Sequence, residues 1–336
     1  MFIVNDYLLA VILCVITMAC WGSWGNTQKL AAKTWRYELF YWDYVIGILL
    51  LSLIFGFTLG SIGDQGRGFF DDITQVSSKN FWNAFIGGII FNASNILLSA
   101  SISLAGMSVA FPVGVGLALV LGVFINYFST PKGDPIILFL GVALIAIAIV
   151  LNGIASGRMS KGTEEGRTKK KGIIIAICAG FLMSFFYRFV ASAMDLNNLE
   201  NPNAGMLTPY GAFFIFSLGI LGSNLIFNTF VMKRPFAGEP VNYSQYFKGS
   251  FNTHLVGIFG GIIWGIGTAF SYIAAGKAGP AISYALGQGA PMIAALWGVF
   301  IWKEFKGSPK IVNYLLVFMF VLFIIGLSMI VISGSN

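Results

Sequence analysis

Uncharged polar and aromatic side chains recur inside the apolar stretches of this 336-residue chain. Trp21, Ser23 and Asn26 lie near the end of the first such stretch, and Asn92 and Asn95 lie in a later one. A spacing of three residues places the two asparagines on one face of a helix. Amides, hydroxyls and indole rings can hydrogen-bond to a solute and stack on it. These residues predict a binding site for a small neutral polar solute.

A second set of such side chains lies in the C-terminal half of the chain. Trp264 and Thr268 are four residues apart, as are Tyr284 and Gln288, so each pair shares a helical face. Gln288 lies between two glycines and is the single residue most strongly predicted to contact substrate. The other interpretation of these amides and hydroxyls is that they bridge neighbouring helices.

Two apolar stretches are predicted to be broken, the first at Pro112 and Gly114 and the second at Gln288 and Pro291. A broken helix exposes backbone groups, which a membrane interior tolerates only where they line a cavity or are paired by neighbours. Both breaks are therefore expected to lie at the cavity.

Few charged residues lie inside apolar stretches. Asp43 is predicted to be a proton-coupling carboxylate, because acids within spanning helices often carry protons. The alternative is favourable placement at the positive N-terminal end of its helix. Arg188 is predicted either to contact substrate or to extend outward to the membrane surface. The two residues are expected at opposite depths, so they do not pair.

Composition places the chain in a membrane. It is 57% hydrophobic and 10% charged, whereas soluble domains carry about a quarter charged residues. The net charge of +7 arises from short connections and indicates contact with membrane lipids, with no nucleic-acid partner expected. Neither the three cysteines nor the single histidine, His254, forms a metal-ligand or nucleophile–base pattern. No enzyme activity, cofactor or metal is expected.

Apolar runs of about 20 residues predict spanning helices. Ten are expected, at 7–28, 40–60, 81–104, 109–128, 136–155, 172–193, 209–231, 255–275, 280–302 and 311–333. Within them the Gly-Gly-Ile-Ile sequence at 87–90 returns at 260–263, and Ala105-Gly106 returns as Ala278-Gly279. The fold class is therefore all-α polytopic, with an internally repeated hairpin.

Orientation follows from the basic residues, which favour the cytoplasmic side. Fifteen of the twenty Lys and Arg residues lie in connections after odd-numbered spans, and four lie after even-numbered spans. Both termini are therefore expected outside a cell (inner) membrane. Five spans on each side of a basic linker, 156–171, predict two inverted repeats, 1–155 and 172–336, that together form one transport domain.

Short motifs resemble those of the ureide permease family within the drug/metabolite transporter superfamily, to which glucose/ribose and rhamnose porters are also related. They are Gly22-Ser23-Trp24, Trp42-Asp43-Tyr44, the sequence TLGSIG at 58–63, Gly87-Gly88, AGMS at 105–108, Asn126-Tyr127-Phe128, LTPY at 207–210, and Trp297-Gly298-Val299 followed by Glu304. The resemblance implies uptake of small neutral solutes such as allantoin and uracil, commonly coupled to protons.

The leading hypothesis is a secondary importer of a ureide or nucleobase that works by alternating access. Transport of a nucleoside, or of a monosaccharide such as ribose, rhamnose or glucose, is the alternative within the superfamily, because the same side chains would bind either class of solute. A ligand sensor without transport is the alternative of another class.

Overall fold

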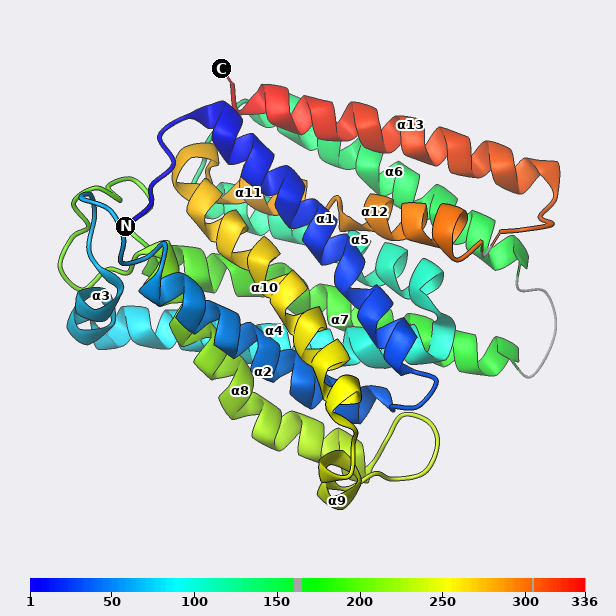
Figure 1. Ribbon diagram of the computed structural model, residues 1–336. Helices are drawn as coiled ribbons and strands as arrows, with labels where there is room; N and C mark the ends of the chain where they lie inside the picture. Colours follow the sequence, from blue (N-terminus) through cyan, green and yellow to red (C-terminus); the bar gives the residue numbers. More distant parts are fainter. Residues whose placement is uncertain (160–164, 304, 336) are drawn as a thin grey trace.

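The computed structural model describes residues 1–159, 165–303 and 305–335, and these residues form a bundle of membrane-length helices (Figure 1). Within these described ranges ten segments are long and apolar enough to cross a membrane, which confirms the all-α polytopic class. Nine are single helices: α1 (Tyr7–Ala31), α2 (Tyr37–Phe57), α4 (Ser78–Ala105), α5 (Met107–Ser129), α6 (Pro135–Met159), α7 (Glu165–Ala193), α8 (Pro209–Lys233), α10 (Phe251–Ala278) and α13 (Lys310–Ser333).

The ninth span in chain order consists of three short segments, α11 (Pro280–Gly287), α12 (Ala290–Leu296) and the π-helix η1 (Trp297–Ile301). Two further short helices, α3 (Phe69–Gln75) and α9 (Tyr243–Phe247), lie in connections. Both chain termini lie toward the left of the bundle in Figure 1. The other end is called the basic end here, because α1 terminates there beside Lys29 and Arg36, which line one hollow.

Helices α6 and α13 pack side by side at the periphery of the bundle (Figure 1). Large apolar side chains such as Ile147 of α6 and Phe318 of α13 are about half exposed. Such faces suit hydrocarbon and leave the polar residues of the other helices for the interior. The two peripheral helices therefore face lipid on this side of the bundle, and none of their described side chains lines the cavity described below.

The repeated hairpin has one backbone conformation in both copies. Gly106 joins α4 to α5 with φ 81° and ψ 158°, and Gly279 joins α10 to α11 with φ 86° and ψ 154°. Glycine adopts positive φ without a Cβ clash. Each glycine also donates its N–H to the carbonyl four residues earlier, which closes the preceding helix. Gly106 lies at the basic end, whereas Gly279 lies against Lys132 at the opposite end.

Glycines also set the closest helix crossings. A Cβ on Gly88 of α4 would lie 2.1 Å from the carbonyl oxygen of Phe216 on α8. A Cβ on Gly261 of α10 would lie 2.0 Å from the carbonyl oxygen of Tyr44 on α2. Small residues at helix interfaces let backbones approach closely in membranes. The two crossings involve the Gly-Gly pairs that recur in the sequence, so the repeat is a packing motif.

The predicted break at Pro112 and Gly114 is wrong, because α5 runs unbroken from Met107 to Ser129. Pro112 is the sixth residue of that helix and removes only a hydrogen bond to its first turn. The second predicted break is confirmed, since α11 ends at Gly287 and α12 begins at Ala290. The repeated hairpin is thus broken in one copy only.

The basic segment 156–171 is helical where it is described, with α6 ending at Met159 and α7 beginning at Glu165. Residues 160–164 of the predicted linker and Glu304 of the last quoted motif lie outside the described residues.

Replacing Gly261 by alanine should destabilise the protein by about 1–3 kcal/mol, because the new methyl group meets a backbone carbonyl that cannot rotate away. The measurement is the thermal unfolding midpoint in detergent. Gly153→Ala is the matched control, since a Cβ there meets no atom within 4 Å. Equal midpoints for the two variants would contradict the close crossing.

Candidate binding site

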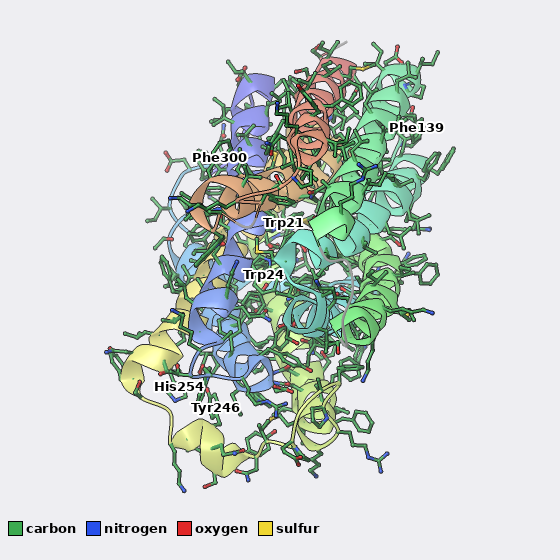
Figure 2. All side chains as sticks on the ribbon, turned by 90° about the vertical axis from the view of Figure 1, so that its right-hand side faces the viewer. Trp21, Trp24, Phe139, Tyr246, His254 and Phe300 are labelled. Carbon is green, nitrogen blue, oxygen red and sulfur yellow. The ribbon has the colours of Figure 1, made fainter. Side chains whose placement is uncertain are left out.

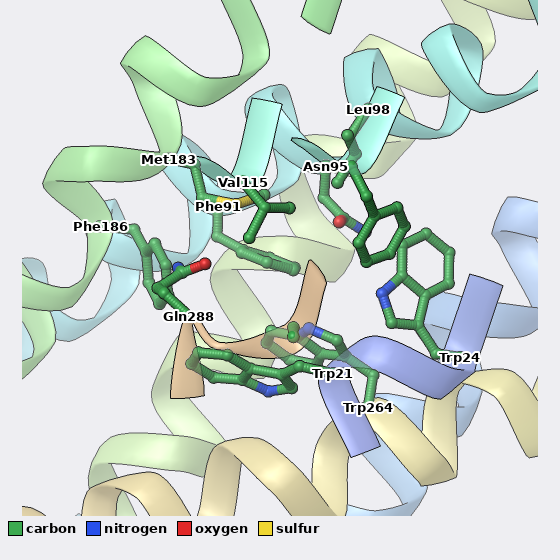
Figure 3. A pocket seen from close by; sticks show the side chains of 12 residues that line it. Trp21, Trp24, Phe91, Asn95, Leu98, Val115, Met183, Phe186, Trp264 and Gln288 are labelled. Atoms are coloured by element: carbon green, nitrogen blue, oxygen red, sulfur yellow. The ribbon is translucent and has the colours of Figure 1, made fainter. Parts of the chain in front are cut away.

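A cavity lies at the centre of the bundle where six spans meet (Figure 3). It is lined by Trp21 and Trp24 of α1; Phe91, Asn95 and Leu98 of α4; Phe111 and Val115 of α5; Met183 and Phe186 of α7; Trp264 of α10; and Gln288 and Ala290 at the α11–α12 break. Of the predicted substrate residues, Trp21, Asn95, Trp264 and Gln288 are brought together here.

Stacked aromatic rings form one wall of the cavity. The indoles of Trp21 and Trp264 are nearly parallel, with centroids 6.0 Å apart and an interplanar angle of 9°. Phe91 stacks on Trp264 with centroids 4.2 Å apart. Gly287 lets Trp21 approach α11, since a Cβ there would lie 2.8 Å from the indole ring. This wall offers flat π faces to a ring-shaped solute.

Two carboxamides supply the polar contacts of the cavity. Asn95 donates from Nδ2 to the hydroxyl oxygen of Tyr41 at 3.3 Å, which orients its amide. Gln288 ends the α11 segment, and its backbone N–H donates to the Tyr284 carbonyl oxygen. Figure 3 shows both carboxamide groups directed toward the cavity. An amide both donates and accepts hydrogen bonds, so the pair matches a solute that presents N–H and C=O groups side by side.

The cavity is nearly filled by its own side chains. Its free volume is about 20 Å³, enough for about one water molecule. A larger vestibule of about 580 Å³ lies at the basic end, where its lining includes Gln28, Trp35, Arg36 and Met107. The structure is therefore a contracted state in which the aromatic rings must move before an organic solute can enter.

A pair of hydrogen bonds separates the vestibule from the cavity. Gln28 donates from Nε2 to the Ser99 carbonyl oxygen at 3.0 Å, and the Ser99 hydroxyl donates to Gln28 Oε1 at 2.8 Å. Ser99 lies one turn from Asn95, which lines the cavity, and Gln28 lines the vestibule. This side is one layer of side chains thick.

The opposite side of the cavity is closed by a fully buried hydroxyl network. Tyr187 of α7 donates to Ser283 Oγ of α11 at 3.2 Å, and the Ser283 hydroxyl donates to the Ser271 carbonyl oxygen of α10 at 2.7 Å. All three side chains have zero exposure. Because the network joins three spans, this side is closed more firmly than the vestibule side.

Thr268 and Tyr284 are buried beside the cavity without lining it. Thr268 Oγ1 accepts the indole N–H of Trp21 at 3.1 Å and so fixes the ring in the aromatic wall. The Tyr284 hydroxyl donates to the Ala118 carbonyl oxygen at 3.1 Å and holds α11 against α5. Both residues position the lining.

Ser23 and Asn26 lie on another face of α1, where they accept hydrogen bonds from Trp297 of η1 and from Trp302, the residue that follows η1. Ser23 Oγ accepts the Trp297 indole N–H at 2.9 Å, and Asn26 Oδ1 accepts that of Trp302 at 2.6 Å. The Lys29 ammonium lies 4.4 Å from the centroid of the Trp302 ring. In this state the two residues fasten η1 to α1.

Asn92 and Arg188 also lie away from the cavity. Asn92 faces α8 and donates from Nδ2 to Ser223 Oγ at 3.0 Å, one turn beyond the glycine crossing of the two helices. Arg188 is exposed on α7. Neither residue touches the cavity in this conformation.

Several lining residues were not among the sequence-predicted site residues, chiefly the apolar ones on α4, α5 and α7. Phe91 is the repeat counterpart of Trp264, and Val115 is that of Gln288, at the same offset of 173 positions. Comparing the two copies position by position could have found both. Met183 and Phe186 carry no such signal, because apolar residues on α7 look alike in the sequence whether they face lipid or the cavity.

Asp43 lies on α2 near the basic end, where it is 1% exposed. Its Oδ1 is 2.8 Å from His254 Nδ1 and accepts the Tyr246 hydroxyl at 2.6 Å, while Oδ2 accepts the Trp35 indole N–H at 3.3 Å. The carboxylate pairs with α9 and α10 and not with Arg188. His254 is the only histidine of the chain, and its pairing with Asp43 has no local signal in the sequence.

The family model described as ureide permease matches residues 40–171 and 158–333, which is most of the chain. The chain belongs to the ureide permease family. Ureide permease 1 and Ureide permease 2 of Arabidopsis thaliana are similar to it, at 23% and 24% identity. The first alignment covers 94% of each chain and the second covers all of both.

More distant relatives of this permease are named for sugars. Glucose uptake protein GlcU of Staphylococcus xylosus is 24% identical over 80% of this chain and 78% of its own. One solved crystal structure of a protein superimposes with a TM-score of 0.62 over 95% of both chains, at 15% identity, and supports the fold alone. The family match and the sugar uptake relatives confirm the predicted resemblance to ureide permeases and to sugar porters.

A cysteine at Ser103 should react readily with a water-soluble maleimide, because Ser103 lines the open vestibule. A cysteine at Ser271 should react at least tenfold more slowly, because that side chain has zero exposure. Labelling rates in detergent, in a background whose native cysteines are replaced by alanine, give the measurement. Comparable rates at the two positions would show that the side opposite the vestibule is open as well.

Proposed function

We propose that this permease takes up a small neutral ring solute of the ureide or nucleobase class, such as allantoin or uracil. The observation that carries the proposal is the pairing of two carboxamides, Asn95 and Gln288, with the stacked Trp21 and Trp264 in one closed cavity. A flat ring with adjacent N–H and C=O groups can hydrogen-bond to the two carboxamides and stack on the indole rings. The names of the Arabidopsis relatives support the same class.

Recognition follows from the geometry of the contracted cavity. A planar ring that enters the cavity inserts against the Trp21 face and displaces Phe91 or Trp24, since the free space is otherwise too small. Burying a ring between aromatic faces is favourable by stacking. Each amide contact then contributes about 0.5–1.5 kcal/mol and rejects solutes whose donors and acceptors are misplaced.

Uptake then proceeds by alternating access between two five-helix halves, residues 1–155 and 172–336. Opening of the Gln28–Ser99 layer exposes the cavity to the basic end, and opening of the hydroxyl network around Tyr187 exposes it to the other end. The basic end is assigned to the cytoplasm of a cell (inner) membrane because Lys and Arg cluster there, which leaves both termini outside. Membrane lipids surround the bundle.

Proton coupling through Asp43 is part of the proposal. Its carboxylate is buried, and the next residue, Tyr44, packs on Trp24 with ring centroids 4.9 Å apart. Only Tyr44 therefore separates Asp43, where the charge changes, from Trp24 in the cavity wall. Coupled uptake would accumulate solute against its gradient when the outside is more acidic.

A monosaccharide is the second candidate substrate, and the glucose and sugar uptake relatives favour it. A sugar also hydrogen-bonds to amides and stacks on an indole, but it presents hydroxyls in place of a planar edge. A ligand sensor is the third alternative. Counterflow in proteoliposomes separates the three, because only a transporter exchanges labelled solute, and competition by uracil or by glucose identifies its class.

Asn95→Leu and Gln288→Leu should each weaken uracil or allantoin binding about tenfold, the equivalent of one hydrogen bond of about 1.4 kcal/mol. Binding is measured as the ligand-dependent rise in the thermal unfolding midpoint. Asn92→Leu is the matched control on the same helix and should keep affinity within about twofold. Equal losses in all three variants would indicate general destabilisation.

A further inference from the structure

Asp43 and three side chains around it form a cluster at the basic end. Trp35 reaches it from the connection between α1 and α2, Tyr246 from α9 and His254 from α10. The Trp35 indole also lies edge-on to the His254 ring, with centroids 5.4 Å apart. In Figure 2, a view onto the basic end, His254 and Tyr246 lie together at the edge of the bundle, away from Trp21 and Trp24.

The charges of this cluster are unbalanced unless the histidine is protonated. Among the described residues His254 is the only basic side chain within ion-pair distance of Asp43. The other groups facing the carboxylate are the neutral Tyr246 and Trp35, together with Gly257, where a Cβ would lie 2.4 Å from that of Asp43. Glu38, earlier on α2, is paired with Arg36.

Access to water differs between the two partners. The Asp43 side chain is 1% exposed, whereas the His254 side chain is 21% exposed. A proton from the aqueous side therefore meets the imidazole first. Imidazole is the side chain whose ordinary pKa lies closest to neutral pH, so it can gain and lose a proton under physiological conditions.

We propose that Asp43 and His254 form one proton-binding unit, with His254 as its point of exchange with water. A proton from water adds to Nε2 of His254 while Nδ1–H stays on Asp43 Oδ1. The cluster then changes from a net charge of −1 to zero, and no other bond forms or breaks. This inference rests on the proposed proton-coupled uptake and adds a second residue to the coupling site.

The structure also connects this unit to the cavity. His254, Gly257, Gly261 and Trp264 follow one face of α10, from the proton-binding unit to the aromatic wall. Gly257 contacts Asp43 and Gly261 contacts the Tyr44 backbone. Neutralising the pair removes an uncompensated buried charge and favours tight contact between α2 and α10. Since Trp264 belongs to the same helix, protonation biases the position of a cavity wall.

The first test is independent of any substrate and uses the fact that His254 is the sole histidine. Protein labelled with ¹³C-histidine, and purified through a histidine-free tag, gives a single imidazole signal whose pH titration is followed by NMR. The proposal requires the titration curve of this signal to change in Asp43→Asn, because the ring and the carboxylate bind the proton together. Identical titration curves in the two proteins would overturn the proposal whether or not the protein transports ureides.

The second test separates proton exchange from hydrogen bonding. His254→Asn keeps an amide N–H near the position of Nδ1 but cannot titrate, whereas His254→Ala removes both functions. In proteoliposomes with an acidic exterior, both variants should lose uracil or allantoin accumulation by at least fivefold and keep counterflow within about twofold. Tyr243→Phe, which removes a hydroxyl of the same helix α9 that bonds to Thr229 and not to Asp43, is the control and should still accumulate solute.

Accumulation by His254→Asn at the wild-type level would assign the histidine a purely structural role and refute the proposal. Absence of counterflow in the wild type for ureides, nucleobases and sugars alike would instead refute the proposed function. In that case the NMR titration still decides whether Asp43 and His254 bind a proton as one unit.

Discussion

A polar group without a partner is costly in hydrocarbon, and the interior of this permease is organised by that constraint. Several amides and hydroxyls of the spanning helices pair across helix boundaries, as Asn92 does with Ser223 and Gln28 with Ser99. Those that line the central cavity, Asn95 and Gln288, direct their carboxamides into it. The proposed solute would hydrogen-bond to these two amides inside the cavity.

The same constraint explains which parts of the site could be predicted from the sequence. A polar residue in an apolar helix must face inward, so the expectation that Trp21, Asn95, Trp264 and Gln288 meet agrees with the structure. The interior of a ten-span bundle has several helix interfaces, however, and the sequence does not distinguish among them. Ser23 and Asn26 face the η1 end of the ninth span, and Asn92 faces α8. Residue spacing shows which side chains share a helical face, but it does not show which neighbouring helix that face contacts.

More of the fold than of the site could be predicted from the sequence. Apolar runs of membrane length located all ten spans, and the repeated glycines marked the crossings at Gly88 and Gly261. Proline was a weaker guide, because its effect depends on its position in the helix: Pro112 is tolerated near the start of α5. The pairing of Asp43 with His254 depends on how α9 and α10 return to α2, a long-range contact without a local signature.

The glycine crossings also bear on how such a bundle can move. Backbones that touch at Gly47 and Gly261, or at Gly88 and Gly219, have no side chains between them that could compress or slide. In the proposed transport cycle each crossing would act as a pivot, about which the helix ends swing while the contact point stays in place. Trp264 and Phe91, which line the cavity, lie within one helical turn of these crossings. The vestibule and the hydroxyl network lie farther from the crossings along the helices. A small rotation then produces its largest displacement at the two ends of the pathway and its smallest at the bound solute.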